Sequence, residues 1–196
     1  ENGSLRPVYF NQKLKSRNES KMENLEKLRS VLSEATKDMR LNLTSVLGGD
    51  GLTEQQRWTV GLCAAFFLRN RTLSDAMIAD AGQRLDAAHI EDAKAAAAIM
   101  AMNTVYYRSK HQLNMPAYET MRASLRMNRM VKPATDKGLF ELCSMACAAL
   151  AGCEACLKSH EASLRKEGFS EAQVHEAIRI AAAINGFVVG YEAEQI

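Results

Sequence analysis

The sequence predicts an all-α fold, and three observations support this prediction. Of the 196 residues, 47% are hydrophobic, yet only 6% are aromatic and three are proline. Alanine and methionine supply much of the apolar content, which favours helices over sheets. Apolar residues also recur at helical spacing behind capping signals. We therefore expect one helical domain over residues 22–196.

The N-terminal part divides into a polar segment and a first helix. Residues 1–21 lack a sustained apolar period, so we predict a disordered extension upstream of a natural start at Met22. From Met22, apolar side chains follow a helical period, and the helix is expected to end before the turn signals at Gly48 and Gly49. The residues on its apolar face are Leu25, Leu28, Val31, Leu32 and Ala35.

The remaining helices are predicted from capping signals and breaks. A capping box of Thr53 and Gln56 opens a buried helix that reaches Leu68, and two further helices are expected over about 73–87 and 90–107. After Pro133, Thr135 or Asp136 caps a helix that ends at Gly152, and the next helix starts directly afterwards. A second capping box, Ser170 with Gln173, begins the last long helix.

A shift of about 85 residues aligns the chain with itself. It places AAAIM at 96–100 over AAAIN at 181–185, which suggests an internal duplication of a helical unit. In this register Leu68 and Arg71 stand where Cys153 and Cys156 stand, so only the second copy would carry chemistry.

Charge and cysteine content limit the class of protein. With 25 basic and 23 acidic residues, the net charge of +2 is too balanced for nucleic-acid or membrane-surface binding. No run reaches the roughly 18 apolar residues that span a bilayer. The five cysteines form an odd set with one close-spaced pair, which indicates a reducing compartment, and we expect a cytoplasmic protein.

That close pair, Cys153 and Cys156, lies in the run GCEACLKSH together with His160. On a helix these three residues share one face, and the helix start stabilises a thiolate. His160 lies one turn beyond Cys156, within reach to exchange its proton. The pattern therefore predicts dithiol redox chemistry, and exposure at a helix start favours Cys153 as the attacking thiol.

Glu141 is the candidate carboxylate, because it stands between Phe140 and Leu142 in an apolar run. A buried carboxylate is suited to proton exchange, whereas a glutamate at the edge of a helix face would be ordinary. Both interpretations remain open at this point.

The cysteine pair also has two alternative interpretations. Cys153, Cys156 and His160 could bind zinc with one more cysteine in a helical interaction module, or the pair could be inert packing. The absence of a second cysteine knuckle favours redox chemistry. We expect Cys63, Cys143 and Cys147 to be core residues.

Other polar residues receive no role. The histidines His89, His111 and His175 are predicted to lie on the surface. The segment Met121 to Lys132, in which methionine alternates with arginine, could bind an anionic partner, but a solvated amphipathic segment is favoured.

The segment FELCSMACAALAGCEACLKSHEASLRKEG resembles the active-site segment of the alkylhydroperoxidase D (AhpD) family, within the carboxymuconolactone decarboxylase-like superfamily. The spacing E-x11-C-x2-C-x3-H carries the resemblance. The runs ENLEKL, KDMRLNL, AAAAIMAMNTVYYR and LRMN extend it from about Met22 to the end of the chain.

The resemblance implies an all-α homotrimer that acts as an antioxidant, lipoyl-dependent peroxidase and disulfide reductase. By position, Glu141 and His160 would relay protons, and Cys156 would attack the hydroperoxide and become a sulfenic acid. Cys153 would donate a proton and resolve the sulfenic acid to a disulfide. The resemblance favours Cys156 as the attacking thiol, unlike exposure at the helix start.

The resemblance also implies the partners. No cofactor or metal would be tightly bound, and the lipoyl group of a dihydrolipoamide acyltransferase would restore the dithiol. A peroxiredoxin, the AhpC component of alkyl hydroperoxide reductase, would be a second partner. Ala155 departs from the pattern, because some members have histidine there, and turnover would then be slower. A lactone decarboxylase of the same superfamily needs no thiols, and the cysteine motif argues against it.

Overall fold

The computed structural model describes residues 22–82 and 84–196, and the predicted extension over 1–21 lies outside them. The described residues are helical and contain no strand, and none of their helices is long and apolar enough to cross a membrane. The bounds are α2 Glu23–Arg29, α3 Lys37–Gly48, α4 Glu54–Phe67, α5 Arg71–Ala81, α6 Ala87–Leu113, α7 Pro116–Glu119, α8 Asn128–Val131, α9 Lys137–Ala151, α10 Glu154–Lys166 and α11 Glu171–Ala193.

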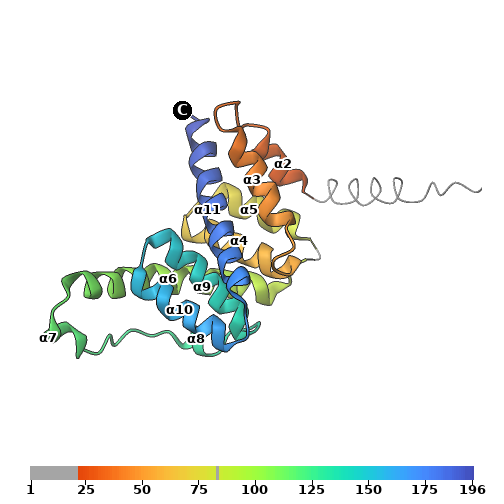
Figure 1. Cartoon of the computed structure of the whole chain (residues 1–196). Helices are drawn as coiled ribbons and strands as arrows, with labels where there is room; N and C mark the ends of the chain where they lie inside the picture. The colour runs from red at the N-terminus through yellow and green to blue at the C-terminus, as the bar shows by residue number, and fades with distance from the viewer. Residues whose placement is uncertain (1–21, 83) are drawn as a thin grey trace, which may run out of the picture.

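The centre of the molecule is the contact between α4 and α9. Helices α6 and α11 each pack against both of these helices, and α3 lies beside α11 (Figure 1). The three largest fully buried side chains, Trp58, Phe140 and Phe187, come from α4, α9 and α11. α10 packs on α9 and α6, at the other end of the molecule from α2 and α5.

The helix bounds reveal a duplicated unit of three helices. α4 and α5 begin 83 residues before α9 and α10, at Glu54 and Arg71 against Lys137 and Glu154, and α6 begins 84 residues before α11. All six helices start behind a side chain that accepts a hydrogen bond from the backbone N–H three residues on. These N-cap residues are Thr53, Asn70, Asp86, Asp136, Cys153 and Ser170.

The structure corrects the register of the repeat. With the helix starts aligned, Asn70 and Leu73, rather than Leu68 and Arg71, stand at the positions of Cys153 and Cys156. The positions of Glu141 and His160 are held by Trp58 and Met77. Trp58, Leu73 and Met77 are all buried core residues. At the positions of Glu141, Cys156 and His160, the first copy therefore holds apolar core residues, and at the position of Cys153 it holds the N-cap Asn70.

The predicted first helix is wrong, because the chain forms α2 and α3 with a break between them. Within the break, the Ser33 backbone and hydroxyl and the Thr36 hydroxyl all donate to the Glu194 carboxylate, the hydroxyls at 2.6 Å. Such side chains compete with helical hydrogen bonding. The predicted apolar position Val31 is 40% exposed as a result.

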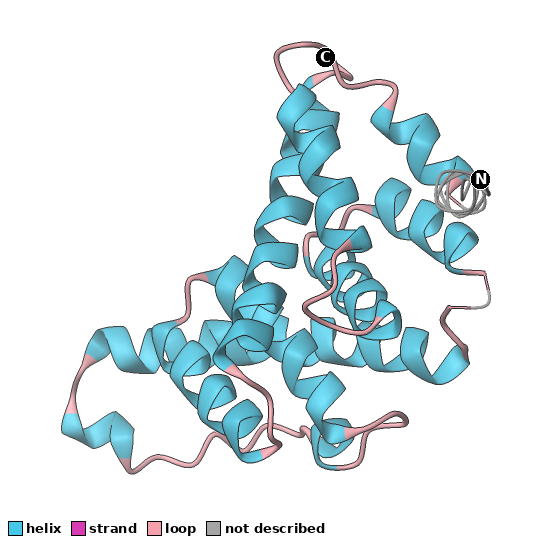
Figure 2. Cartoon of the chain, turned by 45° about the vertical axis from the view of Figure 1, so that its right-hand side comes forward, coloured by secondary structure: helices cyan, strands magenta, loops and turns pink. Residues whose placement is uncertain are grey.

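The later helices also differ from the prediction in length. α5 ends at Ala81 because Gly82 has a φ of 53°. α6 continues to Leu113 before the left-handed Asn114. The end of α6, α7 and the following loop extend away from the rest of the molecule in both views (Figures 1 and 2). Large apolar side chains are exposed on this arm, residues 105–121: Val105, Leu113, Met115, Tyr118 and Met121.

A second segment, residues 127–135, folds back onto α6, and we call it the strap. Asp92 of α6 binds it, with a side chain that is only 1% exposed. This carboxylate accepts hydrogen bonds from the backbone of Ala134 at 3.0 Å, from the backbone and hydroxyl of Thr135 at 2.7 Å, and from Arg129 Nε at 2.8 Å. Burial by itself raises the pKa of Asp92, but these donors outweigh it and hold the pKa below its usual value.

We predict that Asp92→Asn loosens the strap and lowers the free energy of unfolding by about 2–4 kcal/mol at pH 7. The asparagine amide is neutral, and its NH₂ group would face the N–H and O–H donors that bind the Asp92 carboxylate. Because the folded-state pKa of Asp92 is depressed, its stabilisation is complete above the unfolded value of about 3.9 and is lost as pH falls through the folded value. Urea unfolding at several pH values measures both effects.

The matched control is Asp75→Asn, which removes an exposed carboxylate paired with Arg71 and should change stability little. If the free energies of unfolding of wild type and Asp92→Asn still differ by the same amount in acid, the proposed role of the Asp92 carboxylate in holding the strap is contradicted.

Candidate active site at the junction of α9 and α10

The site begins at the sharp turn between α9 and α10. α9 ends at Ala151, and Gly152 takes the left-handed conformation with φ 61° and ψ 35°. The backbone N–H of Cys153 bonds to the Ala148 carbonyl at 3.1 Å. A Cβ on Gly152 would meet no atom within 4 Å, so glycine is favoured here by its backbone conformation rather than by lack of space. The turn places Cys153 directly before α10.

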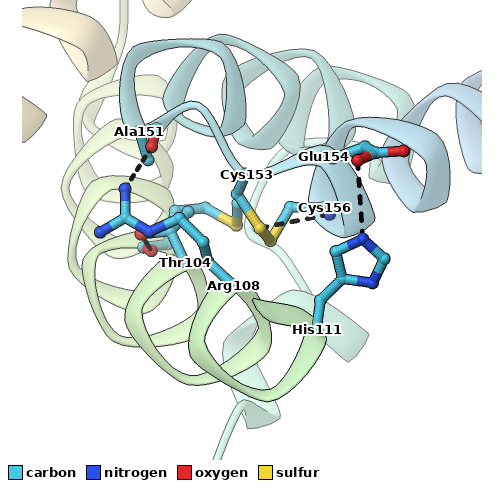
Figure 3. The surroundings of a disulfide bond; sticks show 8 residues. Thr104, Arg108, His111, Ala151, Cys153, Glu154 and Cys156 are labelled. Carbon is cyan, nitrogen blue, oxygen red and sulfur yellow. Dashed lines mark hydrogen bonds and ion pairs between the residues drawn. A yellow bond between two sulfur atoms is a disulfide. The ribbon is translucent and has the colours of Figure 1, made fainter. Parts of the chain in front are cut away.

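The two cysteines of the motif are joined by a disulfide at the start of α10 (Figure 3). Their Cα atoms are 5.2 Å apart, and Cys153 is the N-cap residue of the helix. The backbone N–H of Cys156 donates to Cys153 Sγ at 3.3 Å. A backbone donor at a helix N-terminus stabilises negative charge on the sulfur it faces.

The two cysteines differ in exposure. Cys153 is 0% exposed, whereas Cys156 is 5% exposed and lines a cavity. The first cysteine is therefore not the exposed one, contrary to the argument from helix-start exposure. The physical reason is that the turn at Gly152 directs Cys153 into the protein, while α10 carries Cys156 to the cavity side.

Glu141 and His160 meet across the interface of α9 and α10. The Nδ1 atom of His160 and the Oε2 atom of Glu141 are 2.6 Å apart and share a hydrogen bond. The side chains are 10% and 8% exposed, so both groups are largely removed from solvent. Glu141 is thus a buried carboxylate rather than a residue at the helix edge. A short bond of this kind can pass a proton between carboxylate and imidazole.

A cavity of about 220 Å³ reaches both His160 and Cys156. Its walls come from α6, the strap and α10. They are formed by Asn103, Tyr107, Met127, Met130, Ala155, Cys156, Ser159 and His160. Most of this lining is apolar in character, so the polar atoms that face the cavity are few. The cavity is the route by which a small molecule could approach Cys156.

The walls that α6 and the strap contribute to this cavity were not predicted from the sequence. Asn103 interrupts the apolar run AAAAIMAM with a polar side chain, and this signal could have identified it. Met127 and Met130 lie in the segment that we interpreted as solvated and amphipathic, although they face the cavity. Arg129 of the same segment binds the buried Asp92, while 39% of its own side chain is exposed.

The C-terminal half of α6 covers the disulfide on the side shown in Figure 3. Thr104, Arg108 and His111 project from this helix toward the junction. Arg108 donates to the Ala151 carbonyl, the last of α9, and His111 Nε2 lies 3.5 Å from the Glu154 carboxylate. A cation at a helix C-terminus interacts favourably with the free carbonyls. These contacts connect α6 to the turn that holds the disulfide.

The other cysteines lie in the core. Cys63, Cys143 and Cys147 are fully buried, and the Sγ atoms of Cys63 and Cys147 are 3.5 Å apart. Burial raises the pKa of the Cys63 thiol well above its usual value, and the thiol form is unreactive. This arrangement agrees with a packing role for the three residues.

None of the histidines without an assigned role lines the cavity. His111 and His175 are exposed, and His89 bonds to the N-cap Asp86 of its own helix at 2.7 Å. In the zinc alternative, Cys153, Cys156 and His160 would converge on one ion. Within residues 22–82 and 84–196, no three histidine, cysteine or acidic side chains are grouped to bind a metal.

Comparison with known proteins adds the family. Residues 116–189 match the model of the carboxymuconolactone decarboxylase family. A protein of Anaeromyxobacter sp. (strain Fw109-5) named alkyl hydroperoxide reductase AhpD is 47% identical over 176 residues, which cover 89% of this chain and 95% of that protein.

Two more bacterial proteins of the same name are similar. The one from Azorhizobium caulinodans is 44% identical over 86% of this chain and 93% of its own length. The one from Streptomyces griseus is 41% identical over 88% of this chain and 97% of its own length. The match runs over nearly the whole described domain and includes the motif around the disulfide. The chain therefore belongs to the AhpD family, within the carboxymuconolactone decarboxylase family of proteins.

Proposed function

We propose that this chain is an antioxidant thiol peroxidase that reduces organic hydroperoxides with the Cys153–Cys156 dithiol. The observation that carries the proposal is the position of Cys156, which lines a cavity together with the hydrogen-bonded His160. The name of the relatives, alkyl hydroperoxide reductase, supports the same reaction. A lactone decarboxylase would not need these thiols for its reaction.

In the proposed first step, the Cys156 thiol loses its proton to His160, whose ring is held by Glu141. The thiolate attacks the terminal oxygen of the hydroperoxide, so an S–O bond forms and the O–O bond breaks. The alkoxide that leaves takes a proton from His160 and becomes an alcohol. Cys156 is oxidised by two electrons to a sulfenic acid, and the peroxide is reduced by two electrons.

In the second step, the Cys153 thiolate attacks the Cys156 sulfenic acid. The S–S bond forms and the hydroxyl leaves as water after protonation. The Cys156 backbone N–H, which faces Cys153 Sγ at 3.3 Å, would favour the thiolate form of Cys153 in this step. The product is the disulfide.

Regeneration would begin with a dithiol that enters the cavity and attacks Cys156 Sγ, with Cys153 leaving as the stabilised thiolate. The second thiol of the reductant then displaces Cys156 and leaves as a cyclic disulfide. We propose the lipoyl group of a dihydrolipoamide acyltransferase as this reductant, because a slender arm suits a cavity in which Cys156 is only 5% exposed. The peroxiredoxin AhpC is the proposed second partner, on the resemblance alone.

We also propose a homotrimeric, cytoplasmic protein. The arm supports assembly, since five large apolar side chains are exposed along residues 105–121. Large apolar side chains exposed close together commonly mark an interface between protein chains. The arm continues from the helix that covers the disulfide, so association there would border the site.

We predict that Glu141→Gln and His160→Gln each lower peroxidase turnover by about 10² or more, the effect of losing general acid–base catalysis. Steady-state peroxide consumption measures this loss. Glu154→Gln is the matched control, because it makes the same change at an exposed residue beside Cys153 that pairs with Lys158. It should keep nearly wild-type turnover. A helical, folded Glu141 or His160 variant with normal turnover would remove that residue from the mechanism.

We predict that a lipoylated domain reduces the oxidised protein at least about tenfold faster than thioredoxin at equal concentration, because the buried disulfide offers no flat surface for a protein reductant. Stopped-flow measurement of disulfide reduction compares the two directly, and free dihydrolipoamide serves as the reference for chemistry without docking. Faster reduction by thioredoxin would refute the proposed reductant.

A further inference from the structure

Asn103 of α6 is a buried amide without an internal partner. It is 5% exposed, and its Oδ1 atom has no hydrogen-bond partner. In the described part of the chain, the other buried side-chain nitrogen or oxygen without a hydrogen-bond partner is Arg29 Nε. The guanidinium of Arg29 still binds Glu26. Buried polar atoms are nearly always hydrogen-bonded, because leaving one unpaired costs stability. An unpaired amide in a folded protein therefore requires an explanation.

The fold itself does not require a polar group at this position. In the duplicated unit, Asn103 corresponds to Phe187 when the starts of α6 and α11 are aligned, and to Val188 when the alanine runs are aligned. Both of these residues are buried and apolar. The neighbouring Thr104 satisfies its own hydroxyl, which donates to the Met100 carbonyl at 2.7 Å. Asn103 has no such local bond.

The location of Asn103 points to a ligand. It lines the cavity that also reaches Cys156 and His160, opposite the residues of α10. An amide offers one acceptor and two donors. A hydroperoxide offers an O–H donor and two acceptor oxygens, so it can satisfy the amide in either orientation. A dithiol offers only weak S–H donors and weak sulfur acceptors.

We propose that Asn103 is a substrate-binding residue that holds the hydroperoxide group against Cys156 Sγ. This inference rests on the proposed function. The Asn103 oxygen accepts the hydrogen bond of the terminal O–H, and its NH₂ group donates to the oxygen that leaves. That oxygen gains negative charge as the O–O bond breaks, so the second bond strengthens in the transition state.

The rest of the cavity suggests which hydroperoxides fit. Tyr107, Met127, Met130 and Ala155 surround the space beyond Asn103 with apolar side chains. A volume of about 220 Å³ exceeds what hydrogen peroxide needs, since one water occupies about 30 Å³ in the liquid. The site therefore favours a hydroperoxide with a small apolar organic group, whose burial adds binding free energy.

The test separates the two half-reactions in the full-length protein. Reduced wild type, Asn103→Leu and Asn103→Ala are mixed with tert-butyl hydroperoxide, and the second-order rate constant for Cys153–Cys156 oxidation is measured by rapid quench and mass. The oxidised proteins are then reduced with dihydrolipoamide. We expect both variants to be oxidised about 10-fold to 100-fold more slowly, as for loss of one transition-state donor, and to be reduced within about twofold of wild type.

The variants control for two other effects. Leucine matches asparagine in size and removes the unpaired amide, so its thermal stability should equal or exceed that of wild type. Alanine enlarges the cavity, so a slow alanine variant excludes blockage of the path. Thr59→Val is the matched control, because it removes a buried hydroxyl that is satisfied within α4 by the Gln55 carbonyl, and it should leave both rates nearly unchanged.

Other outcomes would overturn the inference. Wild-type oxidation rates in both Asn103 variants would show that the amide does not bind the peroxide. Equal slowing of both half-reactions, or unfolding of both variants, would assign Asn103 a structural role. If wild type itself is not oxidised by tert-butyl hydroperoxide, the proposed function fails, and the role of Asn103 fails with it.

Discussion

The hydrogen bond between Glu141 and His160 is the contact on which the site depends. It joins α9 to α10 at a point where both side chains are about nine-tenths buried. Either group alone would remain in the protein interior without a partner, which is costly for ionisable side chains. The bond therefore stabilises the packing of α10 on α9 next to the cavity that Cys156 and Ala155 line.

The same contact links the structure to the chemistry. His160 is held by Glu141 through Nδ1, and the same residue lines the cavity. The turn at Gly152 and the N-cap position of Cys153 then place one sulfur inside the protein and one at the cavity. This asymmetry assigns different tasks to two chemically identical side chains. It arises from backbone geometry rather than from the cysteines themselves.

The duplication explains why the scaffold tolerates such a site. The first copy of the three-helix unit holds Trp58, Leu73 and Met77 at the positions of Glu141, Cys156 and His160. An apolar set of this size supplies core packing of the kind that stabilises small domains. The second copy gives up part of that packing for polar groups and an open cavity. The cysteine pair and the Glu141–His160 pair thus lie in one copy only, while α6 of the other copy supplies a wall of the cavity.

Local sequence signals predicted the parts of the fold that local interactions determine. The capping boxes at Thr53 and Ser170 and the stop at Gly152 lie where they were expected. The break after α2 could not be predicted, because Ser33 bonds to Glu194, 161 residues away. The motif also identified Glu141 and His160 as candidates, but their contact depends on the packing of α10 on α9.

The cavity is the clearest case of a feature that sequence alone does not reveal. Its walls come from three separate segments. One of them, the strap, is held on α6 by the hydrogen bonds of Ala134 and Thr135 to the buried Asp92 carboxylate. Long-range contacts of this type leave no periodic signal in the sequence. A polar residue in an apolar helical run, as at Asn103, is the most useful signal that remains.

The central claim is that Cys156, rather than Cys153, is the sulfur that meets the peroxide. The most direct measurement treats reduced Cys153→Ser and Cys156→Ser with one equivalent of tert-butyl hydroperoxide in the presence of dimedone, followed by peptide mass analysis. We expect a dimedone adduct on Cys156 in the Cys153→Ser protein and little adduct on Cys153 in the Cys156→Ser protein. A dominant adduct on Cys153 would contradict it.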